Sequence, residues 1–167
     1  EANGQPLKLK LDVPVARYLQ GVEIAEAAAA DLRAVGIHVE VQPLEWSVFL
    51  SNRRKKTLSP LYFHGFSSAF NEETDLGVLW PSLFANLTAW NHAGFVESYG
   101  SLRRAFSAEE RKKLSYGLQA LIHEEAPWIF LCAQHDFFGG STRIAWVPRP
   151  DERIYLPAFR MKQAAGK

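Results

Sequence analysis

The feature that most limits the fold is a strand, helix, strand pattern in the first forty or so residues. In "LKLKLDV", residues 7–13, apolar and charged residues alternate with the period of two typical of a half-buried strand. From Val22 to Val35 apolar residues follow helical spacing, and Gly36 stands where a left-handed residue would end that helix. "IHVEV", residues 37–41, alternates again. Two strands joined through a helix by short loops predict a parallel crossover unit.

A second helix and a third strand are predicted next. The helix runs from Leu44 to about Lys56 and ends in "RRKK", whose cations complement the negative end of the helix dipole. The following run "SPLYFHGF", residues 59–66, is apolar nearly throughout, as a strand covered on both faces would be. It leads into "GFSSA", residues 65–69, which is either a catalytic turn or a loop against a bound ligand.

The second half of the chain predicts two longer helices and a buried strand. The first helix carries apolar residues at helical spacing, namely Phe95, Tyr99, Leu102 and Phe106. Ser107 with Glu110 makes a capping box that starts the second helix, and Pro127 ends it. "WIFLCA", residues 128–133, then predicts a buried strand in which Cys132 is a small apolar residue. The predicted fold class is α/β.

Composition excludes several classes of function. The chain has 167 residues, 47% of them hydrophobic, which suffices for one ordinary domain with a real core. Its 19 Lys and Arg against 18 Asp and Glu leave a net charge of +1, so we expect no nucleic-acid binding. The single Cys132 excludes an internal disulfide framework. No apolar run approaches the ~20 residues of a membrane span, and the first residues lack a signal-peptide profile.

Ser67 supports an enzymatic alternative, an α/β serine hydrolase. Gly65 and Ser67 match the start of the Gly-x-Ser-x-Gly elbow, but Ala69 replaces its last glycine. An elbow runs directly into a helix whose first amides help form the oxyanion site, whereas "FNEETD" predicts a loop. His135 and Asp136 are adjacent after a strand, so their side chains would point to opposite faces. We keep the hydrolase as the alternative and expect no catalysis.

The histidines predict no metal site. "HEEAP" begins at His123 like a His-Glu-x-x-His zinc helix, but Pro127 occupies the second ligand position. The other four histidines are scattered singly along the chain. No glycine-rich phosphate loop follows a strand, because Gly139 and Gly140 lack the Lys-Ser/Thr that would contact phosphate. We therefore expect neither a metal nor a cofactor.

The order of segments resembles a known family. "IAEAAAADLRAVGIHVEVQPLEWSVFLSNRR", a strand ending in Gly-aromatic, and "AWNHAGFVESYGSLRRAFSAEERKKLSYGLQALIHEEAPWIFL" are similar to the carboxyl-terminal lobe of extracytoplasmic solute-binding proteins. These are the peptide/nickel-binding (family 5) proteins that serve ABC importers, and the resemblance runs from about Leu7 to Phe159. It implies a type II periplasmic-binding-protein-like lobe, with a mixed, mostly parallel sheet flanked by helices. Residues 1–167 would form that single lobe, with about 148–167 returning toward another lobe.

The resemblance also assigns candidate ligand contacts. Family members have Gly-Trp-x-x-Asp in the cleft loop after the third strand, which maps onto residues 65–69. Phe66 keeps an aromatic wall, and Ser67 and Ser68 keep small polar groups, although a turn role explains the serines as well. Ala69 replaces the aspartate that pairs with a peptide's amine, and an ammonium group is costly to bury unpaired. A solute other than an amine-terminated peptide is therefore a second possibility.

Trp90 and Asn91 are the second pair of predicted contacts. They precede the Phe95 helix, where the family pattern places a cleft-edge segment. An indole face with an amide suits a ligand pocket of apolar walls and a few polar groups, but packing of Trp90 in the core explains it equally well.

The resemblance implies a binding module without catalytic activity. It would capture a peptide or similar small solute in a cleft between two lobes and deliver it to the membrane permease of an ABC importer. The protein would then be periplasmic or extracytoplasmic and associate with the membrane through the permease subunits. A lobe by itself is expected to bind its solute weakly or not at all.

Overall fold

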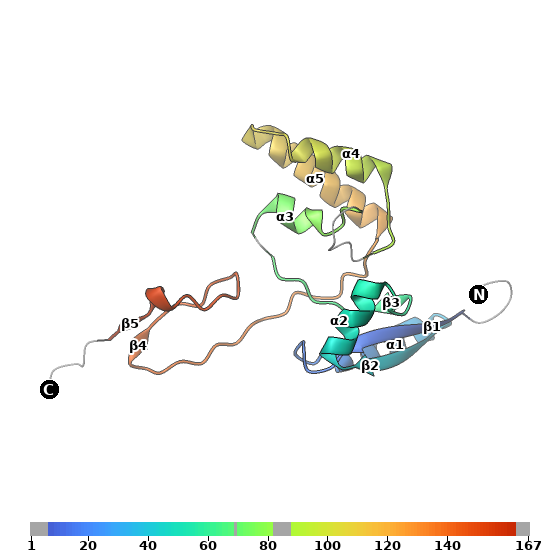
Figure 1. Ribbon diagram of the computed structural model, residues 1–167, viewed down its shortest axis with the longest axis horizontal. Helices are drawn as coiled ribbons and strands as arrows, with labels where there is room; N and C mark the ends of the chain where they lie inside the picture. Colours follow the sequence, from blue (N-terminus) through green and yellow to red (C-terminus); the bar gives the residue numbers. More distant parts are fainter. Residues whose placement is uncertain (1–6, 69, 82–87, 163–167) are drawn as a thin grey trace. The chain divides into compact units, whose positions relative to one another are not determined.

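The computed structural model describes residues 7–68, 70–81 and 88–162. Its elements divide into two compact units, Glu1–Phe66 and Ser67–Lys167 (Figure 1), which we call the first and the second unit. Each unit has a hydrophobic core of its own.

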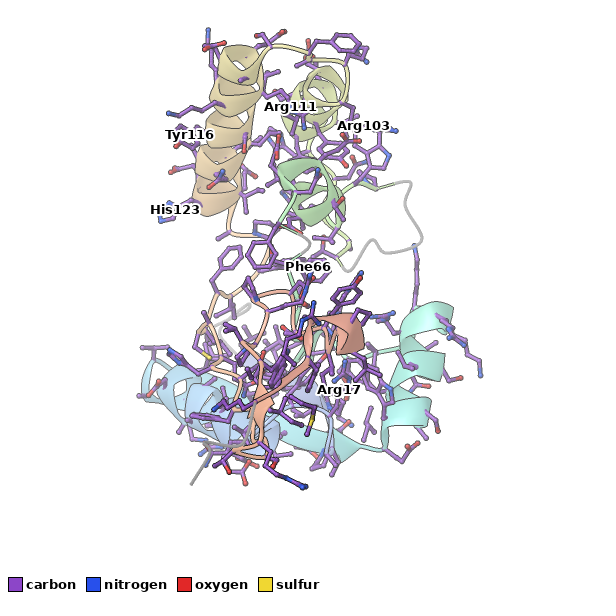
Figure 2. All side chains as sticks on the ribbon, turned by 90° about the vertical axis from the view of Figure 1, so that its left-hand side faces the viewer. Arg17, Phe66, Arg103, Arg111, Tyr116 and His123 are labelled. Carbon is purple, nitrogen blue, oxygen red and sulfur yellow. The ribbon has the colours of Figure 1, made fainter. Side chains whose placement is uncertain are left out.

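The first unit is a parallel sheet between two helices. Its strands lie in the order β2-β1-β3, and both pairings are parallel. Leu7 of β1 lies opposite Ile37 of β2, and the register continues to Pro14 opposite Leu44. Helices α1 and α2 cover opposite faces of this sheet (Figures 1 and 2). The elements are β1 (Leu7–Pro14), α1 (Gly21–Ala34), β2 (Ile37–Leu44), α2 (Trp46–Lys55) and β3 (Leu61–Tyr62).

The predicted crossover unit is confirmed in its details. Alternation in β1 gives way to full burial from Leu11 to Pro14, where the strand has neighbours on both sides. Gly36 takes the left-handed conformation, with φ +87°, that ends α1. Leu11, Val13, Ala25, Ala29 and Val39 form the buried core of the sheet and α1, and Phe49 of α2 is also fully buried. The α/β class is therefore confirmed.

The third strand differs from its prediction. It has only two paired residues, and residues 61–65 are half-buried. The reason is its position at the edge of the sheet, where one side has no neighbouring strand. Buried Asp12 of β1 holds its start, because the carboxylate accepts hydrogen bonds from the Ser59 N–H at 2.7 Å and the Ser59 hydroxyl at 2.9 Å.

The second unit packs α3 (Glu72–Gly77), α4 (Ala93–Leu102) and α5 (Ala108–Glu125) together (Figure 1). The Ser107 side chain accepts a hydrogen bond from the Glu110 N–H at 3.1 Å, which confirms the predicted cap of α5. The helices share a buried core of Val78, Leu79, Phe95, Tyr99, Leu102, Leu118 and Ile122.

Two predictions for the second unit are wrong. Phe106 is 99% exposed, because α4 ends at Leu102 before the helical spacing can carry Phe106 inward. Residues 128–133 form no strand, and Cys132 is exposed. An apolar run is buried as a strand only when its backbone has a partner, and within the described residues this run pairs with no other strand. The chain then continues to β4 (Ile144–Ala145), a short 3-10 helix (Leu156–Ala158) and β5 (Arg160–Met161), with β4 and β5 antiparallel.

Within the described parts of the chain, no helix combines the length and the apolar character needed to cross a bilayer. The assignment of residues 1–167 to one lobe stays a prediction.

Candidate functional site

The candidate site is built at the carboxyl ends of β1 and β3. Because these strands are parallel neighbours, the loops that leave them start at the same edge of the sheet. Tyr18 follows β1 and His64 follows β3, and the Tyr18 hydroxyl lies 2.8 Å from His64 Nδ1 although 46 residues separate them. The ring of Phe63 meets Tyr18 edge to face, with centroids 5.7 Å apart. The loop after β1 and the end of β3 are thus tied to each other.

His64 lies between Arg53 and Tyr18 in one hydrogen-bonded chain. Arg53 of α2 donates to His64 Nε2 at 3.2 Å, and an arginine can only donate. We therefore assign the ring proton to Nδ1, which donates to the Tyr18 oxygen, while the Tyr18 hydroxyl donates to the Gly65 carbonyl at 3.3 Å. Burial, followed by the nearby charges of Arg53 and Arg17, lowers the pKa of His64 to about 4. The imidazole is therefore uncharged at neutral pH.

Gly65 is required where the chain passes the Tyr18 ring. A Cβ atom at this position would lie 2.6 Å from Tyr18 Cε1 and 2.9 Å from Cδ1, closer than carbon atoms approach. The ring is rigid and its hydroxyl is engaged with His64, so it cannot move aside freely. The glycine lets the backbone approach the ring and carry Phe66 out of the strand.

Arg17 adds a second cation to this edge of the sheet. Its guanidinium lies 5.2 Å from the centroid of the Tyr18 ring and 5.2 Å from that of Trp46. Both distances are within the range of cation–π attraction. The arginine is nevertheless exposed, so its N–H groups remain open to solvent. Figure 2 marks Arg17 and Phe66, both in the first unit.

The residues predicted for the cleft loop divide between the two units. Phe66 ends the first unit and is 49% exposed, as a side chain available to a ligand must be. Ser67 and Ser68 begin the second unit and are exposed. The Ser68 hydroxyl donates to Asp75 Oδ2 at 2.6 Å and accepts from the Phe70 N–H at 3.0 Å, which is the turn role that the sequence left open. Ala69 lies outside the described residues.

Trp90 packs against the core of the second unit. Its ring lies 5.1 Å from that of Phe95 and 5.7 Å from that of His92, which caps α4 by accepting from the Phe95 N–H at 3.2 Å. Trp90 is only half-buried, so part of the indole also faces solvent, and Asn91 beside it is exposed. Both predicted roles of Trp90 are compatible with this position, and Asn91 stays a predicted contact.

A hollow of about 290 Å³ lies within the second unit, between α3 and α4. Its lining includes Trp80 and Tyr99, whose rings are 5.0 Å apart, and the ion pair of Arg103 with Glu73. None of the residues predicted from the sequence contributes to it.

The described residues give the hydrolase alternative no support. Neither ring nitrogen of His64 is directed at Ser67, because Tyr18 and Arg53 occupy both. The next helix, α3, begins only at Glu72, so its first N–H groups do not follow Ser67 as an elbow requires. No cluster of three or more potential metal ligands occurs in the part of the chain that the structure describes.

Sequence interpretation missed the network of Tyr18, His64, Arg53 and Arg17. In the sequence, His64 is one of several scattered histidines, and Arg53 belongs to the basic end of a helix. One signal was available: parallel neighbours bring the residues just after β1 and just after β3 to the same edge. The hydrogen-bond partners of His64 and the burial that keeps its ring uncharged could not be predicted from the sequence.

Neither a family model nor a curated protein matches this sequence. Solved structures do match. AppA of Clostridium difficile, assigned to peptide binding, is 21% identical with a TM-score of 0.67, covering 75% of this chain and 26% of AppA. The chain has the fold of part of a type II solute-binding protein.

Two further proteins share this solute-binding fold. DppA of Helicobacter pylori, an ABC-transporter-associated periplasmic protein solved with the peptide STSA, is 23% identical with a TM-score of 0.63. NikA of Brucella suis, solved with Fe(III)-EDTA, is 24% identical with a TM-score of 0.54. In both cases the match covers 75% of this chain and 26% of the other. The chain thus spans about a quarter of the length of these solute-binding proteins.

Proposed function

We propose that this chain is the carboxyl-terminal lobe of a two-lobe protein that captures a small solute for an ABC importer. The observation that carries the proposal is the fold match, which takes in three quarters of this chain but only a quarter of a peptide-binding protein. Solute-binding proteins with this fold hold cargoes as different as a peptide and a metal chelate. The solute class therefore depends on side chains at the cleft rather than on the fold.

In this proposal the cleft wall includes the end of the first unit and the residues that follow it. Phe66 presents an exposed ring at the carboxyl edge of a parallel sheet, where α/β folds bind ligands. Ser67, Ser68, Ala69, Trp90 and Asn91 complete the predicted set of contacts. The solute, touching both lobes, stabilises their closed arrangement, and the permease subunits recognise that arrangement. The protein acts outside the cytoplasmic membrane and catalyses no reaction.

The test uses the full-length protein that contains this chain. A panel of peptides, glutathione-like compounds, opines, sugars and metal chelates is screened by thermal shift. Each hit is then measured by titration calorimetry and by X-ray scattering. We expect at least one hit to raise the melting temperature and to lower the radius of gyration through closure. Binding without compaction would contradict the two-lobe mechanism.

Phe66→Ala tests the cleft assignment, with Phe106→Ala as its matched control. Both phenylalanines are exposed, but Phe106 is 99% exposed and lies beyond the end of α4. Phe66→Ala removes an aromatic wall, so it should weaken solute binding by roughly 10-fold or more. Phe106→Ala should leave the solute affinity unchanged. Equal affinities in both variants would remove Phe66 from the site.

The hydrolase alternative makes a separate prediction. A fluorophosphonate probe should then label Ser67 covalently, and Ser67→Ala should abolish the label. We expect no label on the native protein, and labelling at Ser67 would overturn the assignment as a binding module.

A further inference from the structure

The Trp90 side chain is held between two rings of the second unit. Its indole is stacked on the imidazole of His92, with centroids 5.7 Å apart and an angle of 18° between the planes. It also meets the buried Phe95 edge to face at 5.1 Å. Trp90 is half-buried, so these two rings cover part of the indole and leave the rest exposed. One of the two supports, His92, is itself only partly buried.

The His92 ring is fixed on several sides. Its Nδ1 accepts a hydrogen bond from the Phe95 N–H at 3.2 Å, which caps α4. Because Nδ1 is the acceptor, the ring proton lies on Nε2, which faces Glu125 Oε1 of α5 at 3.9 Å. A Cβ atom at Gly94 would lie 3.1 Å from His92 Cε1, so the glycine leaves the ring the space that it occupies. These contacts restrict how the imidazole can turn.

A cap alone does not require an imidazole. The side chains that cap α2, α3 and α5 are those of Glu45, Asn71 and Ser107, each of which accepts from backbone N–H groups without a ring. Such a side chain at position 92 would satisfy the Phe95 N–H equally well. The imidazole adds a flat face, and Trp90 lies against that face.

An indole that is already held in place is a better ligand contact than a free one. A side chain that is ordered before binding loses less conformational entropy when the ligand arrives. The backbone of Trp90 is restrained as well, because its N–H donates to the Thr88 hydroxyl at 3.1 Å. All of these contacts lie within the second unit.

We propose that His92 is a positioning residue for the solute, because its ring fixes the Trp90 indole in the orientation that contacts the solute. His92 acts through Trp90 and does not contact the solute itself. This inference rests on the proposed function, in which Trp90 is one of the predicted contacts. It adds a residue that sets the strength of that contact for solutes with an apolar group that can pack on an indole.

Two substitutions separate the ring of His92 from its cap. His92→Asn keeps an oxygen that can cap α4 but removes the ring, whereas His92→Phe keeps a ring but removes the cap. His92→Asn should weaken solute binding roughly 3- to 10-fold, and His92→Phe should come close to the native affinity. The melting temperatures should follow the opposite order, because only His92→Phe loses the cap. If affinity and melting temperature follow the same order, His92 is only a cap and the inference is wrong.

Affinity is measured on the full-length protein by titration calorimetry. The probes are trialanine, glutathione, octopine, maltose and Fe(III)-EDTA, one from each class of the wider screen, and each probe that compacts the native protein is compared across the variants. Trp90→Ala should weaken such a probe at least as much as His92→Asn does. A Trp90→Ala variant with native affinity would overturn the inference, because His92 would then position nothing that contacts the solute.

His123→Asn is the matched control. It removes an exposed imidazole from α5 in the same unit (Figure 2). Its affinity for the probe should equal that of the native protein. A loss as large as that of His92→Asn would mean that the effect does not depend on the ring beside Trp90, and would contradict the inference.

A second measurement needs no solute. Acrylamide quenching of the Trp90 fluorescence is obtained as the difference between each protein and the same protein carrying Trp90→Phe, because the chain contains five tryptophans. His92→Asn should increase this quenching, since the stacked ring no longer covers the indole, and His92→Phe should leave it near the native value. Unchanged quenching in His92→Asn would show that Phe95 alone holds the indole, and would overturn the inference.

The outcomes separate this inference from the proposed function. If a solute closes the full-length protein and binds His92→Asn with native affinity, the function stands and the positioning role is wrong. If the quenching changes as expected but no compound of the wider screen binds, the contact between His92 and Trp90 is real. The proposed function then fails, and the role of this contact in binding fails with it.

Discussion

The two compact units hold their arginines against different partners. In the second unit, Arg111 Nη2 lies 2.7 Å from Glu72 Oε1, and Nη1 also donates to the carbonyls of Leu102 and Ala105 at 3.3 Å. In the first unit, Arg53 donates to an uncharged histidine. Figure 2 marks Arg111 among the helices of the second unit.

This difference separates an arginine that is paired with a carboxylate from one whose acceptor is uncharged. Arg111 already has the carboxylate that a guanidinium attracts most strongly, and it joins three segments around the core of its unit. The contact of Arg53 is weaker, because a neutral imidazole is a weaker acceptor than a carboxylate. Because each unit has a hydrophobic core of its own, the stability of each unit should depend on that core.

The largest effect is expected from truncating a core phenylalanine in either unit. Phe49 and Phe95 are both fully buried, in the first and the second unit respectively. Changing either to alanine removes its ring contacts and leaves a cavity, which should cost about 3–5 kcal/mol. Urea denaturation measures this loss, and hydrogen exchange locates it.

The exchange pattern decides whether the units are separate folding units. Phe95→Ala should increase exchange in α4 and α5 and leave β1 and β2 protected, with the reverse pattern for Phe49→Ala. Equal loss of protection in both units from either substitution would show that they unfold together.

A smaller effect is expected from adding a methyl group at a glycine. Gly65→Ala would place its Cβ 2.6 Å from the Tyr18 ring, so the ring must shift and its bond to His64 must lengthen. We expect a loss of about 1–3 kcal/mol, typical of overpacking.

Gly117→Ala is the matched control for Gly65→Ala. It lies inside α5 with no atom within 4 Å of the added Cβ, and it should stabilise the protein by up to about 1 kcal/mol. Thermal denaturation compares the two variants. An unchanged melting temperature for Gly65→Ala would mean that Tyr18 is not fixed by its contacts.

The sequence predicts local structure better than the contacts that build the site. The alternation of β1, the left-handed Gly36 and the Ser107 cap were predicted because each depends on a few neighbouring residues. The bond between Tyr18 and His64 joins residues 46 positions apart, and no spacing rule specifies it. Residues 128–133 illustrate another limit, because an apolar run indicates burial but does not specify which surface covers it.

The pH dependence of stability tests the neutral histidine of the first unit. His64 has a folded pKa of about 4 against an ordinary value of 6.5, so the unfolded chain binds its proton first as the pH falls. The contribution of His64 is therefore complete above pH 6.5, declines as the pH falls toward 4, and declines no further below that. The slope is at most about 1.4 kcal/mol per pH unit, and less because the ring is partly open to solvent.

Other groups titrate in the same range, so the measurement compares the native protein with His64→Gln. The groups that face the ring are Arg53, Arg17 and the Tyr18 hydroxyl. The difference in unfolding free energy between the two proteins should fall as the pH is lowered through this window. A difference that stays constant would mean that His64 is solvated and titrates normally.

The smallest effect is expected from the ion pair that opened the comparison. Arg111→Gln removes the Glu72 pair and the bonds to two carbonyls, so it should lower the melting temperature modestly, and added salt should reduce the loss because the pair is partly exposed. Arg53→Gln removes no carboxylate contact, and its effect on stability should be smaller than that of Arg111→Gln. Equal effects of the two substitutions on stability would mean that the carboxylate contact of Arg111 contributes nothing measurable.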